Sequence, residues 1–189
     1  VLCYRGQHVP PRCDAGVGRD GLGCINLQQF GVTENHVVIF AFGEIDARTH
    51  IGRQRDELRR DLEEIIETLA TAYVNTILLN RSLYKSLLCI VYSVTPPADG
   101  IENPELPFYG SIQDRVMITK RLNARLAALC RQFDIEFLNV YRNYSDHRGI
   151  LKPKYRDFWG IHIESSSNKA IIKKLNKILI KHHLPIVNK

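Results

Sequence analysis

The chain has 189 residues, with 26 lysines and arginines against 20 acidic residues and a formal net charge of +6. This length suffices for a core that needs no disulfide or metal, so we expect a single domain over residues 1–189. Five cysteines, odd in number and without the close pairs of a zinc site, indicate reduced thiols in a cytoplasmic protein. No stretch is long and apolar enough to span a bilayer.

Residues 1–35 have an irregular pattern that is rich in glycine and contains two adjacent prolines. The glycines of residues 16–21 lack the spacing of a dinucleotide fingerprint, and no Lys-Ser or Lys-Thr pair follows them as in a phosphate loop. We therefore interpret residues 16–21 as a loop.

A continuous apolar run follows over residues 37–42, rich in β-branched and aromatic residues. The run is too short for a buried helix and predicts a strand covered on both faces, as in a parallel sheet. Glu44, Asp46 and Arg48 come directly after it. Because ligands of open α/β sheets bind beyond the carboxyl ends of the strands, these three residues are candidates for a site.

Apolar residues at helical spacing then predict one amphipathic helix from about residue 53 to the mid-70s or residue 79. Residues 87–94 predict a second buried strand, which is ended by two adjacent prolines. The stripe from Ile118 to Phe133 predicts a second long helix, and residues 135–140 predict a third strand that lies near a sheet edge or is of mixed burial. This alternation predicts an α/β domain with a central, mainly parallel sheet.

The chain ends with capping residues 165–168 and a lysine-rich amphipathic helix. Its lysines alternate with a stripe of isoleucines and leucines, and no aromatic residues stand between the charges as stacking platforms would. We therefore expect a solvated face, and nucleic-acid binding through this helix is the weakest alternative. The lysines are Lys173, Lys174, Lys177 and Lys181.

Four short blocks, in this order, resemble the SGNH (GDSL-type) hydrolase family. They are Gly-Glu-Ile-Asp at 43–46, Ser-Val-Thr-Pro-Pro at 93–97, Asn-Ala-Arg-Leu at 123–126 with the strand after it, and the block from Asp157 to His162. Phe-Gly-Glu-Ile-Asp at 42–46, with Gly18-Arg19-Asp20 upstream, is similar to a branch of the family found beside polysaccharide genes. The resemblance implies a three-layer, flavodoxin-like α/β sandwich, and an esterase or acyltransferase that needs no cofactor and no metal.

The resemblance also implies roles for individual residues. His162 corresponds to the base of an acyl-transfer triad and Asp157 to the acid that orients it. Four residues separate them where the family has two, so Asp157 could point elsewhere and backbone carbonyls could orient the ring. Gly18 matches the backbone donor of the oxyanion hole, but it could equally be an ordinary turn glycine.

Two departures from the family pattern bear on activity. The family's nucleophilic serine ends its first strand, whereas no serine precedes Ser82 here. We expect the nucleophile to lie on a strand just upstream of Val1, so that the printed chain is inactive or very feeble. Ile45 stands where the family has the asparagine of the oxyanion hole, and Arg48 or Arg19 would have to replace that donor.

The remaining candidates line or shape a pocket. Gly43 is a candidate for shaping the pocket, and Glu44 and Asp46 could form a carboxylate pair for acid–base work or metal, but a structural or pocket-shaping role is favoured for Glu44, Asp46 and Arg48. Arg48 is close enough in sequence to pair with Asp46. Near His162, Tyr155, Phe158 and Trp159 could form a sugar-stacking wall or anchor the last loop to the core.

We therefore hypothesise an SGNH-type hydrolase or acyltransferase that acts on an ester, such as an O-acetyl group on a carbohydrate. The rival hypothesis is a non-catalytic protein of the same fold that binds a glycan or small acid in polysaccharide assembly, which Ile45 and the altered Asp-to-His spacing favour. The sequence leaves the oligomeric state open.

Overall fold

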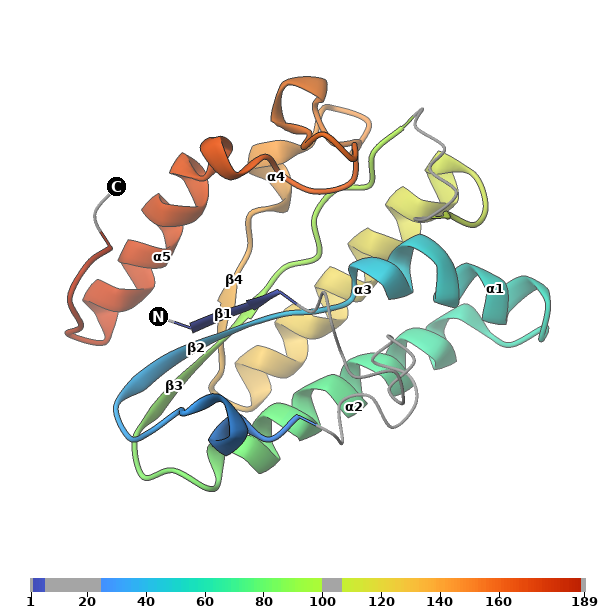
Figure 1. Ribbon diagram of the computed structural model, residues 1–189. Helices are drawn as coiled ribbons and strands as arrows, with labels where there is room; N and C mark the ends of the chain where they lie inside the picture. Colours follow the sequence, from blue (N-terminus) through green and yellow to red (C-terminus); the bar gives the residue numbers. More distant parts are fainter. Residues whose placement is uncertain (1, 6–24, 100–106, 188–189) are drawn as a thin grey trace.

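The structure is a computed structural model that describes residues 2–5, 25–99 and 107–187. These residues form a four-stranded parallel sheet with helices on both faces (Figure 1). The sheet order is β1-β2-β3-β4, so β4 lies at an edge, as predicted. The strands are β1 (Leu2–Arg5), β2 (His36–Ala41), β3 (Leu87–Tyr92) and β4 (Glu136–Leu138).

The helices divide into two layers, one on each face of the sheet (Figure 1). One layer contains α1 (Ile51–Asp56), α2 (Leu62–Arg81) and α3 (Ile112–Gln132). The other contains the short α4 (Tyr141–Tyr144) and the lysine-rich α5 (Lys169–Lys181). The predicted three-layer α/β sandwich is therefore confirmed.

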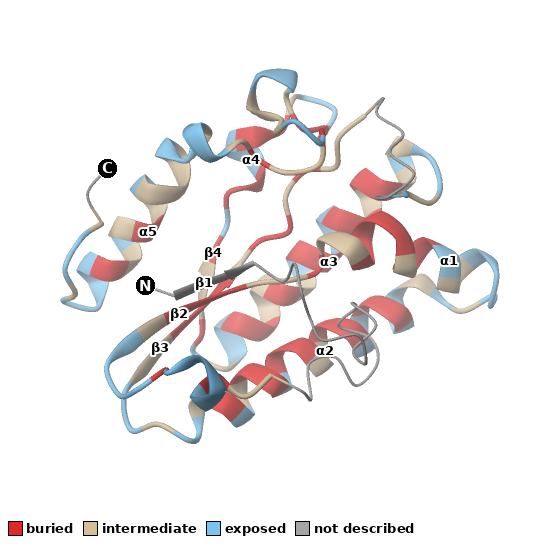
Figure 2. Cartoon of the chain, viewed as in Figure 1, coloured by how far each residue is buried: buried red, intermediate tan, exposed pale blue. Residues whose placement is uncertain are grey.

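Successive residues of β2 show why this strand needs cover on both sides. Val38 and Phe40 belong to the core on the α2 and α3 face, whereas Ile39 belongs to the core on the α5 face. All three are at most 6% exposed, and Figure 2 shows the buried residues along the strands and along the helix sides that face them. Because side chains alternate along a strand, a continuous apolar run fits only a strand between two layers.

The helix predicted from residue 53 onwards is wrong in one respect, because it is two helices. The chain leaves α1 at Asp56, and Arg59 takes a left-handed conformation with φ of +51°. Asp61 then caps α2, since its carboxylate accepts a hydrogen bond from the Glu64 N–H at 2.9 Å. Leu58, which fitted the apolar stripe, is 66% exposed because it lies in this break.

The ends of the chain differ in how far they match expectation. Residues 2–5 form β1, within the stretch whose sequence pattern is irregular. Residues 6–24, with Gly18 and Arg19, lie outside the described residues.

In α5, Leu175 and Leu179 are buried while Lys173 and Lys177 are exposed, which confirms the solvated basic face. No helix in the described part of the chain could cross a bilayer.

Candidate active site

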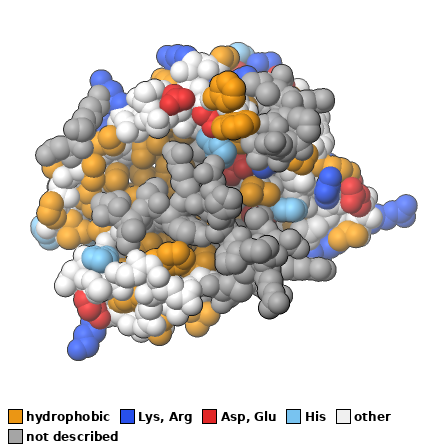
Figure 3. Space-filling view, in the orientation of Figure 1, with side chains coloured by type: hydrophobic (Ala, Val, Ile, Leu, Met, Phe, Trp, Pro, Cys, Tyr) orange, Lys and Arg blue, Asp and Glu red, His pale blue; other side chains and the backbone are white. Residues whose placement is uncertain are grey.

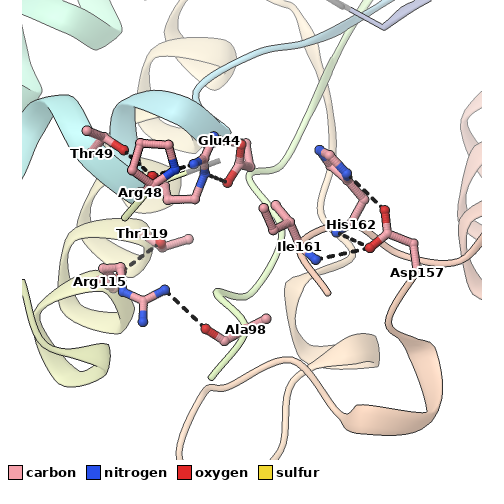
Figure 4. A network of polar contacts seen from close by, with 10 residues as sticks. Glu44, Arg48, Thr49, Ala98, Arg115, Thr119, Asp157, Ile161 and His162 are labelled. Atoms are coloured by element: carbon pink, nitrogen blue, oxygen red, sulfur yellow. Dashed lines mark hydrogen bonds and ion pairs between the residues drawn. The ribbon is translucent and has the colours of Figure 1, made fainter. Parts of the chain in front are cut away.

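Three segments at the carboxyl edge of the sheet surround a pocket: residues 43–49 after β2, residues 93–98 after β3, and the loop 157–162 before α5 (Figure 4). Helix α3 and the residues just before it close the pocket from one side. In parallel sheets all strands end at the same edge, which is why segments far apart in sequence meet here. Lining residues used below are Glu44, Arg48, Ala98, Phe108, Arg115 and Ile161.

The segment after β2 turns at Gly43. Its φ is +97°, and a Cβ at this position would lie 2.9 Å from Cγ2 of Val94, so a side chain would be strained and crowded. The turn leads into a single π-helical segment, Asp46–His50, a rare element that occurs often at functional sites. Gly43 thus lets the end of β2 pack against the end of β3 and directs the next residues to the pocket.

Arg48 is the centre of the polar contacts after β2 (Figure 4). Its Nε donates to Oε1 of Glu44 at 2.7 Å, and its Nη1 donates to the carbonyl of Pro107. Arg48 is 9% exposed, and the Thr49 hydroxyl donates to the same carbonyl at 3.0 Å. The pairing that we expected with Asp46 is replaced by this pair with Glu44, because residues four apart share one side of a helical turn.

Asp46 does not take part in the pocket lining that the described residues form. It is 3% exposed at the start of the π-helix, so it is part of the buried support of this segment. The carboxylate pair proposed for Glu44 and Asp46 therefore does not face one open site. Among the described residues, no group of three or more His, Cys, Asp or Glu side chains could hold a metal ion.

The segment after β3 is fixed by Asn123 of α3. The buried Asn123 side chain accepts a hydrogen bond from the Val94 N–H and donates one to the Val94 carbonyl, both at 2.8 Å. This double contact replaces the backbone partners that Val94 loses where β3 ends. The Asn block that contributed to the family resemblance thus holds the pocket wall in place.

Arg115 is a pocket residue that the sequence reasoning missed. It is 5% exposed, its Nη1 donates to the carbonyl of Ala98 at 3.1 Å, and its guanidinium lies 4.2 Å from the ring centre of Phe108. A sequence signal did exist, because Arg115 lies seven residues before Leu122, on the apolar stripe of α3. A charged residue on such a stripe is buried at a cost and has a specific environment.

Asp157 and His162 are brought together by a tight loop. The Asp157 Oδ2 lies 3.1 Å from Nδ1 of His162, and Oδ1 accepts hydrogen bonds from the N–H groups of Ile161 and His162 at 3.0 and 3.2 Å. The Asp157 N–H donates to the His162 carbonyl at 2.9 Å. The Asp157 carboxylate therefore reaches the imidazole in spite of the wider spacing, and the alternative of a backbone carbonyl is not what the structure shows.

The imidazole has one ring nitrogen available for chemistry. Its side chain is 41% exposed, that of Asp157 is 17% exposed, and within the described residues no hydroxyl or thiol is hydrogen-bonded to Nε2. Ser93, which directly follows β3 and lies near the site, is fully buried, and its hydroxyl accepts a hydrogen bond from the Val140 N–H. None of the described serines thus has the position of a nucleophile beside His162.

The aromatic residues near His162 have different environments. Tyr155 packs edge-to-face on the buried Tyr144, with ring centres 5.1 Å apart, so it anchors the loop. Phe158 is 89% exposed and Trp159 is 47% exposed, and the two rings lie edge-to-face at 5.4 Å. The space-filling view shows hydrophobic side chains next to histidine and acidic side chains on this face (Figure 3).

The residues that we expect at an oxyanion hole are only partly among the described residues. Ile45 is half-buried at the start of the π-helix and carries no side-chain donor. Arg48, one expected replacement, already donates to Glu44 and to Pro107. Gly18 and Arg19 lie outside the described residues, so their roles stay predictions.

Comparisons with known proteins support the fold. No family model matches the chain, and no curated protein matches it. Several solved structures, in contrast, match the chain. A GDSL-like lipase from Bacteroides thetaiotaomicron matches with a TM-score of 0.54 at 15% identity over 82% of this chain and 95% of its own. A carbohydrate acetylesterase from Sinorhizobium meliloti matches with 0.57 at 16% identity over 89% and 74%.

A third match is the aryl esterase of M. smegmatis, with a TM-score of 0.54 at 18% identity over 85% of this chain and 67% of its own. The chain therefore has the α/β fold of GDSL-like, or SGNH-type, hydrolases. At these identities the likeness defines the fold, and the chemistry must be argued from the residues of the site.

Proposed function

We propose that this protein is an SGNH-type ester hydrolase or acyltransferase whose base is His162 and whose orienting acid is Asp157. The observation that carries the proposal is the 3.1 Å contact between Asp157 Oδ2 and His162 Nδ1, on an exposed loop at the carboxyl edge of the sheet. The nucleophile of the proposal is a serine on a segment N-terminal to the printed sequence, because none of the described serines contacts Nε2.

The contact has a definite chemical consequence. A hydrogen bond from Nδ1–H to Asp157 places the lone pair of the neutral imidazole on Nε2. Nε2 can then take the proton of the serine hydroxyl while the serine oxygen attacks the ester carbonyl. The imidazolium returns that proton to the leaving alcohol, and water or a second alcohol takes the acyl group from the serine in the following step.

A carbohydrate ester is the substrate class that the surroundings favour. The exposed Phe158 and Trp159 lie in the same loop, four and three residues before His162, and aromatic faces are suited to stacking on the apolar faces of sugar rings. Two large aromatic rings that stay exposed do not contribute to the hydrophobic core, and such exposed apolar surface is typical of a binding site. The fold neighbour from Sinorhizobium meliloti is itself a carbohydrate acetylesterase, which supports the same class.

A non-catalytic glycan- or ligand-binding protein is the second candidate. Ile45 favours it, because an isoleucine at the position of the oxyanion asparagine removes a donor whose loss typically costs about 10²–10³ in rate. In that case the pocket and the aromatic rings would bind a ligand without reaction.

Labelling with a fluorophosphonate probe distinguishes the two candidates. The protein would be produced with its encoded segment upstream of Val1, treated with the probe, and the labelled residue located by peptide mass spectrometry. The hydrolase proposal expects an upstream serine to be labelled and the label to be lost in His162→Ala. A folded full-length protein without any labelled serine would contradict the hydrolase and support the binding protein.

A further inference from the structure

The strongest unexplained feature of the pocket is the guanidinium of Arg115. The residue is 5% exposed, and its only hydrogen bond in the described structure joins Nη1 to a neutral acceptor, the Ala98 carbonyl. The Nε atom is buried and has no hydrogen-bond partner among the described residues. A buried donor without an acceptor costs about 1–3 kcal/mol, and more when the group is charged, so the position calls for a partner.

The carboxylates of the described residues do not provide that partner. Glu44 is in the same pocket, but it accepts from Nε of Arg48 at 2.7 Å. Asp99 and Glu44 act on Arg115 through longer-range attraction, and Arg48 opposes them. Burial lowers the pKa of Arg115, yet an arginine remains protonated at neutral pH. The pocket is therefore lined by a charged guanidinium whose Nη2 donates no hydrogen bond among the described residues, while its Nε is shielded from solvent.

We propose that this pocket binds the carboxylate of an acidic sugar, with Arg115 as the residue that recognises it. The inference rests on the proposed function in one respect, since it names uronic-acid esters as the class of substrate presented to His162. Guanidinium groups and carboxylates are planar and form charge-assisted hydrogen bonds, which makes arginine the usual partner of this group.

The position of the pocket connects this recognition to the site of reaction. Gly160 and Ile161 line it and directly precede His162 in the chain, and in Figure 4 Ile161 lies between the Glu44–Arg48 pair and the imidazole. The exposed Phe158 and Trp159 belong to the same loop. A sugar could thus place its carboxylate at Arg115 and its ring near the aromatic residues, with an acyl-bearing hydroxyl toward Nε2.

Binding of glucuronate and glucose tests the inference independently of any reaction. The two sugars differ in the carboxylate, so calorimetry with the full-length protein should give at least about tenfold tighter binding of glucuronate. Arg115→Gln should abolish this difference. Arg121→Gln is the matched control, because Arg121 lies on the same helix but is half-exposed and pairs with Glu63, and it should keep the preference.

A spectroscopic measurement on the unmodified protein covers the case in which Arg115→Gln does not fold. The ¹⁵N resonance of the Arg115 Nε–H, assigned with Arg115→Lys, should shift on addition of glucuronate and not on addition of glucose. Equal binding of the two sugars, an unmoved Nε–H resonance, or a preference that survives in folded Arg115→Gln would overturn the inference. Tighter binding of inorganic phosphate than of glucuronate would overturn the assignment to a sugar carboxylate.

The two proposals can fail separately. Labelling of an upstream serine together with equal binding of glucuronate and glucose would leave the hydrolase in place and remove the uronate pocket. A preference for glucuronate without any serine labelling would leave the pocket in place and remove the hydrolase.

Discussion

The two sides of the candidate site are built in different ways. On one side, Arg48 and Arg115 are at most 9% exposed and are held by the segments around α3. On the other side, the His162 side chain is 41% exposed and Phe158 is 89% exposed, and the loop is held by the Asp157 carboxylate together with backbone hydrogen bonds and the bridge between Arg156 and Ile163. The buried side defines shape and charge, whereas the loop keeps a ring nitrogen available.

This difference separates effects on activity from effects on stability. Changes in the loop remove few buried contacts, so they should alter reactivity more than the free energy of unfolding. Changes on the buried side disturb the ends of β2 and β3 and the start of α3, so they should alter stability first. Single substitutions on each side test this separation.

His162→Ala should have the largest effect. If the ring is the base of an acyl-transfer site, the esterase rate of the full-length protein should fall on the order of 10⁶-fold. The free energy of unfolding should change by less than about 1 kcal/mol, since the side chain is partly exposed. Rates on an acetyl ester and urea unfolding measure the two quantities.

The exposed His147 provides a matched control for His162. His147→Ala removes the same ring from a neighbouring surface loop and should leave the rate unchanged. Equal rates in His162→Ala and wild type would show that any esterase activity arises without this imidazole.

Asp157→Asn should have the next largest effect. The amide keeps an oxygen for the N–H groups of Ile161 and His162, but it no longer carries the charge that stabilises the imidazolium. We expect a rate loss of about 10⁴-fold, as for other triads that lose only this charge. Rates of the wild type and of Asp157→Asn, measured across a range of pH, give the size of this loss. Activity within twofold of wild type would mean that Asp157 serves the loop conformation alone.

The sequence was sufficient for the layers of the fold. The apolar run in β2 and the stripes of α2 and α3 are long patterns, so single exceptions do not hide them. The break between α1 and α2 was missed because Leu58 continues the period by coincidence while the backbone at Arg59 turns left-handed. A left-handed arginine has no sequence signal, since glycine or asparagine is usual there.

The site was less predictable because its contacts join distant segments. The wider spacing of Asp157 and His162 argued against their pairing, and only the tight loop resolves it. Arg115 pairs across 17 residues with the Ala98 carbonyl, a backbone atom that carries no sequence signal at all. Glu44 and Arg48 lie at the pocket because the end of a parallel strand is a position defined by the fold, whereas Asp46 next to them lines no part of it.

Gly43→Ala should test the buried side. The left-handed φ of +97° and the 2.9 Å approach to Val94 Cγ2 mean that a methyl group adds strain and crowding together. We expect a loss of about 2–4 kcal/mol in the free energy of unfolding. Urea unfolding measures it, and Gly31→Ala is the control, because Gly31 also has a positive φ of +68° but has open space around it. Equal losses in both variants would show that φ alone matters.

Asp114→Asn should have the smallest effect, at the start of the helix that carries Arg115. The Ser111 hydroxyl, and then Arg55, hold the pKa of the Asp114 carboxyl below its usual range, and Ser111 and Asp114 form a reciprocal cap. Because the folded pKa is the lower one, the carboxylate stabilises the fold above the unfolded pKa of about 3.9, and this is lost as pH falls through the folded value.

The variant should therefore cost about 1 kcal/mol at pH 7 and progressively less as the pH falls below about 4. Urea unfolding at pH 7 and at about pH 3 measures this change in the free energy of unfolding. Adding Ser111→Ala to Asp114→Asn should cost about a further 1 kcal/mol, because it also removes the hydroxyl oxygen that accepts from the Asp114 N–H at 3.1 Å. A loss that is equal at pH 7 and pH 3 would mean that the cap works without the charge of Asp114. The start of α3, and with it the position of Arg115, would then depend on hydrogen-bond geometry alone.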